Sequence, residues 1–167
     1  PGFYRLGNRV FRCWKRRGHG HVALREAIKQ SCDVYFYKLG EKMGIDTISG
    51  YARKNGFHHQ TGIVLPGEHR GVVPGREWKL RHIGRSWQGG DTLNTSIGQG
   101  FTMVTPLQIA RYISALLNGG YLLRPNLRIQ SEPTQQGRLP LSAKELNFLL
   151  RSMRATVEEP HGTAWRL

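Results

Sequence analysis

The 167-residue chain lacks the features that mark several common classes of protein. No stretch approaches 18 consecutive apolar residues and no basic-then-apolar leader opens the chain, so we expect neither a membrane span nor a secretion signal within it. It has no internal repeat and no low-complexity tract. Its two cysteines are too few for a disulfide framework. The length suits one compact domain with its own core.

Acidic residues are also scarce. The chain has 11 Asp and Glu against 25 Lys and Arg, a formal charge of +14. This balance favours anionic partners such as nucleic acid, phospholipid head groups or acidic polymers, although a solvated surface explains it equally well. Trp14, Trp78 and Trp87 lie among basic residues, which makes a nucleic-acid-binding module one alternative. Against it, the sequence shows no recognition helix, RNA-binding signature or complete zinc finger.

Strand-forming segments are few, so we expect helices to dominate the fold. Good helix formers at four-residue spacing predict a short amphipathic helix over residues 22–30. Asp33 can cap a second helix, over residues 34–43, which would end at Gly44. A third helix is expected over residues 46–55, with Asp46 as its cap.

Glycine-rich segments precede the two clearest helices. Residues 62–67 are predicted to be extended and closed by a Pro-Gly turn, and residues 84–100 to be a long loop. Thr105 and Pro106 begin the next helix, and a capping box at residues 142–145 begins the last. Both helices are predicted to bury an apolar face. These faces comprise Ile109, Ala110, Ile113, Leu116 and Leu117 in the first helix, and Leu146, Leu149, Leu150 and Met153 in the second.

The tripeptide Ser31-Cys32-Asp33 places a hydroxyl, a thiol and a carboxylate side by side. Taken alone, Ser31 and Asp33 are most simply helix-start residues, because both types are favoured there. Cys13, His19 and Cys32 are all good zinc ligands, although their spacing is not that of a standard finger. A disulfide between the two cysteines and a pair of unrelated buried thiols are the alternatives.

Several short motifs follow one another along most of the chain. They are GHG at residues 18–20, SCD at 31–33, REWK at 76–79, WQGGDT at 87–92, IGQG at 97–100 and TPLQIA at 105–110. In this order and spacing they resemble the transpeptidase domain of class B penicillin-binding proteins, and most closely the elongation-specific members. Each motif is weak by itself, and the combination is strong.

This resemblance implies an α/β (α+β) fold, the helix-rich central part of a transpeptidase domain like those of penicillin-binding proteins and serine β-lactamases. It implies a serine-type peptidoglycan D,D-transpeptidase that cross-links D-alanyl-D-alanine stem peptides during cell elongation, at the periplasmic face of the bacterial inner membrane. Stem peptides and β-lactams would be its ligands and elongation-machinery membrane proteins its partners. No nucleic acid and no catalytic cofactor are implied. A non-catalytic scaffold with the same fold is a further alternative.

Enzymes of this kind use three motifs, S-x-x-K, S-x-N and K-[S/T]-G. Only the second has a counterpart here, at residues 31–33, because no serine has a lysine three positions on and no lysine begins the third motif. Residues 162–164, Gly-Thr-Ala, resemble a segment that stands just upstream of the third motif in such proteins. We therefore expect residues 1–167 to be a partial domain, with the first motif and the membrane anchor before residue 1 and the third motif after residue 167. Alone, the chain is expected to be inactive and not to be acylated by penicillin.

The resemblance also implies roles for individual residues. Ser31 would face a groove at a turn between two helices and pass a proton between the catalytic lysine and the departing D-alanine nitrogen. Asp33 would hold the stem-peptide amide, and as a carboxylate in place of the usual Asn it favours a substrate N–H. Relatives can carry structural zinc beside this motif. His19 and Cys32 match two of its ligands, Cys13 stands where those proteins have an acid, and a fourth ligand would lie before residue 1.

Overall fold

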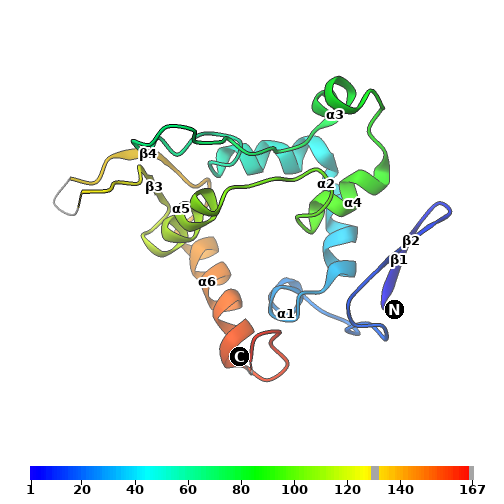
Figure 1. The fold of residues 1–167 in the computed structure, drawn as a ribbon. Helices are drawn as coiled ribbons and strands as arrows, with labels where there is room; N and C mark the ends of the chain where they lie inside the picture. The colour runs from blue at the N-terminus through cyan, green and yellow to red at the C-terminus, as the bar shows by residue number, and fades with distance from the viewer. Residues whose placement is uncertain (129–131, 166–167) are drawn as a thin grey trace.

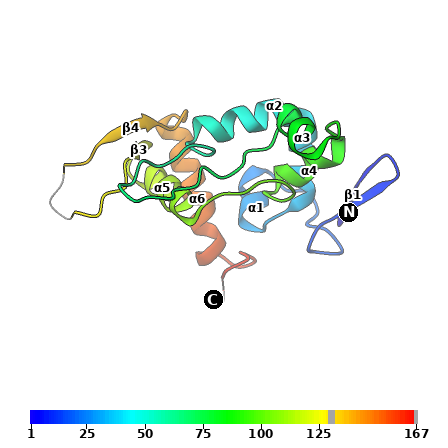
Figure 2. The same cartoon turned by 45° about the horizontal axis from the view of Figure 1, so that its top comes forward.

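The computed structural model describes residues 1–128 and 132–165, which form a mixture of helices and short strands (Figures 1 and 2). In chain order the elements are β1 (Phe3–Leu6), β2 (Arg9–Arg12), α1 (Leu24–Lys29), α2 (Asp33–Lys54), α3 (Arg76–Ile83), α4 (Gly89–Ser96), α5 (Pro106–Leu117), β3 (Tyr121–Leu123), β4 (Gln135–Arg138) and α6 (Ala143–Glu158). None of the described helices is long and apolar enough to cross a membrane.

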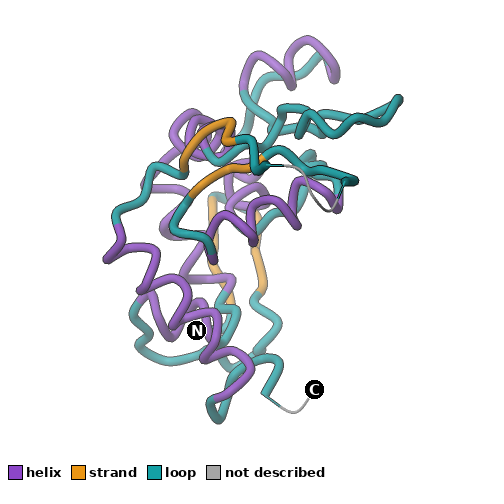
Figure 3. The backbone as a smooth tube through the Cα atoms, turned by 90° about the vertical axis from the view of Figure 1, so that its left-hand side faces the viewer, coloured by secondary structure: helices purple, strands orange, loops and turns teal. Residues whose placement is uncertain are grey.

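The described strands form two separate antiparallel hairpins, as Figure 3 shows. In the first hairpin Phe3 of β1 lies opposite Arg12 of β2. The second joins β3 to β4, with an irregularity between Leu122 and Leu123. Residues 62–67 form a loop with a turn at Pro66-Gly67 and do not join a sheet. The scarcity of strands predicted from the sequence is therefore observed in the described chain.

Helix α2 combines the second and third predicted helices into one kinked element. Gly44 interrupts it with φ 74° and ψ 159°. This backbone conformation suits glycine, which explains why the first arm ends where predicted. The helix resumes directly afterwards and runs to Lys54, so the second arm starts earlier than the cap predicted at Asp46. Helix α1, at Leu24–Lys29, is shorter than its predicted span.

The prediction of a loop over residues 84–100 is wrong at its centre, where α4 packs along α2. The sequence of this helix begins with two glycines and has no apolar residues at helical spacing, so periodicity does not predict it. Its start is fixed by Asp91, whose carboxylate accepts the backbone N–H of Gln88 at 2.7 Å. The same carboxylate binds the buried ammonium of Lys79 in α3 at 2.6 Å. Two of the family-like motifs, at residues 76–79 and 87–92, are thus joined to one another inside the fold.

The starts of α5 and α6 are confirmed, but their buried faces were only partly predicted. The hydroxyl of Thr105 accepts the N–H of Gln108 at 3.1 Å, and Ser142 begins α6 in the same way. Leu116 and Leu146 are buried as predicted, whereas Leu117 is 69 % exposed. Further exposed members of the predicted faces are Ile109, Ala110 and Met153. The buried face is rotated because each helix packs one side only, against β3 for α5 and against α1 for α6.

Two clusters of buried side chains form the core. One comprises Cys13, Ala27, Cys32, Val34, Tyr37 and Leu93, around α1, α2 and α4. The other comprises Ala115, Leu116, Leu122, Leu139 and Leu146, around α5, β3 and α6. The first cluster includes both cysteines, so it lies directly beneath the tripeptide at residues 31–33.

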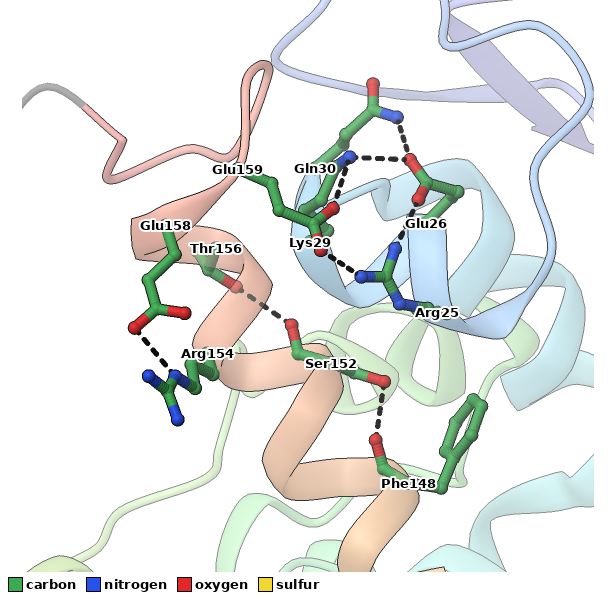
Figure 4. Close-up of polar contacts among 10 residues, drawn as sticks. All are labelled: Arg25, Glu26, Lys29, Gln30, Phe148, Ser152, Arg154, Thr156, Glu158 and Glu159. Carbon is green, nitrogen blue, oxygen red and sulfur yellow. Dashed lines mark hydrogen bonds and ion pairs between the residues drawn. The ribbon is translucent and has the colours of Figure 1, made fainter.

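A network of polar side chains joins α1 to the end of α6 (Figure 4). We call this network the polar junction. Glu159 binds Arg25 and, at 3.2 Å, Lys29. Glu26 and Gln30 extend the network along α1, with a hydrogen bond of 2.9 Å between them. Because Lys29 is largely buried, this ion pair is less screened than a surface pair. The junction fixes the segment that follows α6 next to the turn that follows α1.

Gln108, in the TPLQIA motif, fastens the long loop between α2 and α3. Its side chain is 3 % exposed, and its Nε2 donates to the carbonyls of His59 at 2.8 Å and Arg70 at 2.9 Å. Its Oε1 accepts the N–H of Thr105 at 3.0 Å. The motif therefore has a structural explanation that involves no catalysis.

Replacing Gln108 with Ala is expected to lower the free energy of unfolding by about 2–3 kcal/mol, because two carbonyls lose the donor that the buried amide supplies and one N–H loses its acceptor. The midpoint of thermal unfolding of the purified protein measures this as a fall of roughly 5–10 °C. Gln99→Ala, at an exposed glutamine, is the matched control and should change the midpoint by less than about 2 °C. Equal midpoints for both variants would contradict the role of Gln108.

Candidate active site

Ser31 directly follows Gln30, the C-cap of α1. The N–H of Ser31 donates to the carbonyl of Ile28 at 3.2 Å, and the N–H of Cys32 donates to that of Ala27 at 2.9 Å. This pair of bonds is the Schellman motif, in which the residue after the C-cap is left-handed and usually glycine. Ser31 occupies that position with φ 50°. The serine is therefore a helix-end residue and not the helix-start residue that local preference suggested.

A serine in this conformation carries a steric cost of about 1–2 kcal/mol that glycine would avoid. The surrounding packing holds it there, because Ala27 and Cys32 on either side of the turn both belong to the first core cluster. Strained non-glycine residues of this kind concentrate at functional sites. The hydroxyl of Ser31 is thus presented by a rigid turn between α1 and α2.

Ser31 lines a cleft of about 500 Å³. The other lining residues are Trp14, Lys15, Gln30, His161, Gly162 and Thr163. The Oγ of Ser31 lies 3.2 Å from the Oγ1 of Thr163. A larger cleft, of about 690 Å³, lies between the second arm of α2 and α3, and none of the site residues predicted from the sequence lines it.

Asp33 does not cap α2, contrary to the prediction. The N-cap is Cys32, with no side-chain hydrogen bond, and Asp33 is the first helical residue. Its Oδ2 accepts the backbone N–H of Trp14 at 3.1 Å. The carboxylate therefore bridges from the start of α2 to the segment that follows β2.

Cys13 and His19, on the segment between β2 and α1, come together with Cys32, on the turn between α1 and α2. Their ligand atoms all lie within 4.8 Å of one another, and the Sγ of Cys13 is 3.6 Å from the Nδ1 of His19. Ligand atoms of a tetrahedral zinc site with one sulfur and one nitrogen are roughly 3.5 Å apart. Both thiols are free and 5 % exposed. The pair Cys13 and His19 therefore has the separation of zinc ligands, and all three residues are of types that bind zinc.

The electrostatics of these ligands follow from their burial. Burial raises the pKa of the Cys32 thiol, and the neighbouring Cys13 raises it further. Burial also lowers the pKa of His19, assisted by the charge of Lys15. A neutral imidazole is the form that binds a metal, whereas the thiol must first lose its proton.

The sequence did not identify two residues that contact the tripeptide. In the sequence, Trp14 stands out only as one of several tryptophans among basic residues, and it directly follows the candidate ligand Cys13. Thr163 lies in the Gly-Thr-Ala segment, whose only distinguishing feature in the sequence is its resemblance to a family segment. That segment was the one available signal, and it gave no indication of a contact with Ser31.

Comparison with known proteins identifies the family. The family model for the penicillin-binding protein transpeptidase domain matches residues 1–166. The chain belongs to this family. The peptidoglycan D,D-transpeptidase MrdA of Haemophilus influenzae is 42 % identical over 129 residues, covering 76 % of this chain and 20 % of that protein. The MrdA protein of Escherichia coli is 37 % identical over 129 residues, again covering 76 % of this chain and 20 % of that protein.

Solved structures of the family share the fold. PBP2 from Helicobacter pylori superposes with a TM-score of 0.90 at 39 % identity, covering 99 % of this chain and 31 % of that chain. PBP2 from Pseudomonas aeruginosa gives a TM-score of 0.89 at 34 % identity, covering 99 % of this chain and 38 % of its own. The predicted fold class and family are thereby confirmed. The chain spans about a fifth of the length of the curated relatives it matches.

The left-handed turn predicts opposite effects for two substitutions at position 31. Ser31→Gly should leave the midpoint of thermal unfolding unchanged or slightly raised, because glycine relieves the strain. Ser31→Val should lower the free energy of unfolding by about 1–2 kcal/mol, because a β-branched residue is disfavoured at positive φ. Thermal unfolding of the two purified variants distinguishes them, and an equal loss in both would contradict the observed backbone conformation.

Proposed function

We propose that residues 1–167 are the central part of the transpeptidase domain of a peptidoglycan D,D-transpeptidase. The observation that carries the proposal is the position of Ser31, on a strained turn that lines a cleft, within a chain that matches the family over residues 1–166. The relatives named D,D-transpeptidase support this reaction. A nucleic-acid-binding role has no comparable support.

In the proposed reaction a serine from an S-x-x-K segment outside this chain attacks the carbonyl between the two D-alanines of a stem peptide. The terminal D-alanine leaves and must gain a proton, and the hydroxyl of Ser31 passes it from the lysine of that segment. Asp33 accepts an N–H of the stem peptide, which keeps the scissile bond aligned. The K-[S/T]-G segment would also come from outside these residues. A second stem-peptide amine then takes the acyl group, and no cofactor takes part.

Partners and location follow from the same assignment. PBP2 from Helicobacter pylori has been solved in complex with MreC. A chain in the structure of a peptidoglycan synthase complex is 30 % identical to this chain. On this basis the full-length protein would work at the periplasmic face of the inner membrane with membrane proteins of the elongation machinery. β-Lactams would acylate its nucleophile as mimics of the stem peptide.

Fluorescent penicillin should label the full-length protein and not the isolated 167-residue chain. Ser31→Ala should slow acylation of the full-length protein by about 10²–10³-fold, because a positioned proton-transfer group contributes on that order. Stopped-flow fluorescence with the purified proteins measures the rate. An unlabelled full-length protein would refute the assigned reaction, and a labelled isolated chain would show that the nucleophile lies within these residues.

A structural zinc ion is proposed at Cys13, His19 and Cys32, supported by the convergence of their ligand atoms. The ion would cross-link the segment after β2 to the turn between α1 and α2. Because Cys32 stands between Ser31 and Asp33, the cross-link would hold both residues in place. A fourth ligand would come from elsewhere in the protein or from water.

Purified full-length protein should contain about one zinc ion per chain. Cys32→Ser and Cys13→Ser should reduce this content about tenfold or more and lower the thermal midpoint, because the unfilled site leaves a buried cluster without its cross-link. Since the raised pKa of Cys32 makes binding displace a proton, zinc should be released as the pH falls. His21→Ala, at an exposed histidine outside the cluster, is the control. Elemental analysis at several pH values measures the content, and full zinc in the cysteine variants would exclude the site.

A further inference from the structure

Trp14 contacts both polar members of the tripeptide at residues 31–33. Its indole Nε1 donates to the carbonyl of Gln30 at 3.1 Å and to that of Ser31 at 3.0 Å. Its backbone N–H donates to the carboxylate of Asp33 at 3.1 Å. The last carbonyls of a helix have no partner within it, so the indole satisfies two acceptors at the end of α1. One residue thereby fixes the turn under Ser31 and one oxygen of Asp33.

The side chain of Trp14 is not held in place by burial. It is 59 % exposed and forms part of the wall of the cleft that contains Ser31. Its ring makes an edge-to-face contact with His19, with centroids 5.4 Å apart. Because most of its surface is exposed, Trp14 contributes little to the stability of the core. Its contacts instead determine where the residues at the cleft lie.

Thr163 approaches Ser31 from the other end of the chain. Its backbone N–H donates to the carbonyl of Lys29 at 3.2 Å, and its hydroxyl lies 3.2 Å from that of Ser31. The ion pairs of Glu159 with Arg25 and Lys29, drawn in Figure 4, fasten the start of this segment to α1. Thr163 is thus placed by contacts on both sides of the junction between α1 and α6.

Gly162 lets this segment lie close to the end of α6. A Cβ at position 162 would be 2.2 Å from the carbonyl oxygen of Thr156, so no other residue fits without a shift of the backbone. The N–H of Ala164, two residues further on, donates to the same carbonyl at 3.1 Å. The Gly-Thr-Ala sequence is therefore explained by geometry: the glycine permits the approach, and the threonine hydroxyl is directed to Ser31.

A serine hydroxyl rotates to suit its partners and can donate one hydrogen bond while accepting others. A proton relay needs that hydroxyl to accept from one group and donate to the next in a single orientation. The fixed hydroxyl of Thr163 occupies one of these directions and so restricts the rotation of Ser31. Trp14 bonds to the carbonyl of Ser31 and so fixes the backbone position from which the same hydroxyl extends.

We propose that Trp14 and Thr163 are positioning residues for acyl transfer: Trp14 holds the turn of Ser31 and the carboxylate of Asp33, and Thr163 orients the Ser31 hydroxyl. This proposal rests on the proposed transpeptidase function. It adds two residues, 149 positions apart in the chain, that act through the tripeptide without touching the acyl group. Neither belongs to the three motifs that define the active site of such enzymes.

The test uses stopped-flow acylation of the purified full-length protein by a fluorescent penicillin, analysed for the binding constant and the acylation rate k2 separately. Thr163→Val, which removes the hydroxyl and keeps the shape, should lower k2 about three- to tenfold with unchanged binding. Thr163→Ser keeps the hydroxyl and should remain within about twofold of the wild type. Thr47→Val, at an exposed threonine of α2, is the matched control.

Trp14→Phe keeps a ring and removes the indole N–H, and it should also lower k2 about three- to tenfold. Trp78→Phe, outside this cleft, is its control. Wild-type k2 in Thr163→Val, or an equal loss in Thr163→Ser, would overturn the orienting role of the hydroxyl. Wild-type k2 in Trp14→Phe would overturn the role of the indole. If the wild type itself is not acylated, the transpeptidase assignment fails and the positioning roles fail with it.

Discussion

The arrangement of the site depends on the left-handed turn that closes α1. Two backbone hydrogen bonds, to Ala27 and Ile28, end the helix and force Ser31 into a conformation that usually requires glycine. Retaining a serine there sacrifices about 1–2 kcal/mol of stability for a side chain at a fixed place. The turn sits on buried Ala27 and Cys32, so the core beneath it supplies the rigidity.

The same turn connects the candidate metal site with the candidate catalytic residues. Cys32 faces the core between Ser31 and Asp33, while Cys13 directly precedes Trp14, whose N–H groups reach the carbonyl of Ser31 and the carboxylate of Asp33. Anything that moves one cysteine therefore moves a contact of the cleft. The metal-site residues and the cleft residues are coupled directly, because they are neighbours in the chain: Cys13 precedes Trp14, and Cys32 stands between Ser31 and Asp33.

The sequence located some elements and missed others for identifiable reasons. Capping residues placed the starts of α5 and α6 correctly, because an N-cap is a local hydrogen bond between neighbours in the chain. Helix α4 was missed because it depends on packing against α2 and on the ion pair of Asp91 with Lys79 of α3. The buried face of α5 was only partly predicted, since periodicity identifies apolar positions but not the side on which a partner lies.

The sequence by itself determined the family, the side-chain types at residues 31–33, and the absence of the first and third motifs from these 167 residues, because these depend only on which residues occur and in what order. Only the tertiary structure decided that Ser31 is left-handed, that Cys13, His19 and Cys32 converge, and that Thr163 meets Ser31 across 132 positions. Those features arise where α1 packs against α2 and α6 and where the segment after β2 meets the turn between α1 and α2. Contacts between distant segments are set by such packing and by buried ion pairs, and local residue preferences carry no record of them.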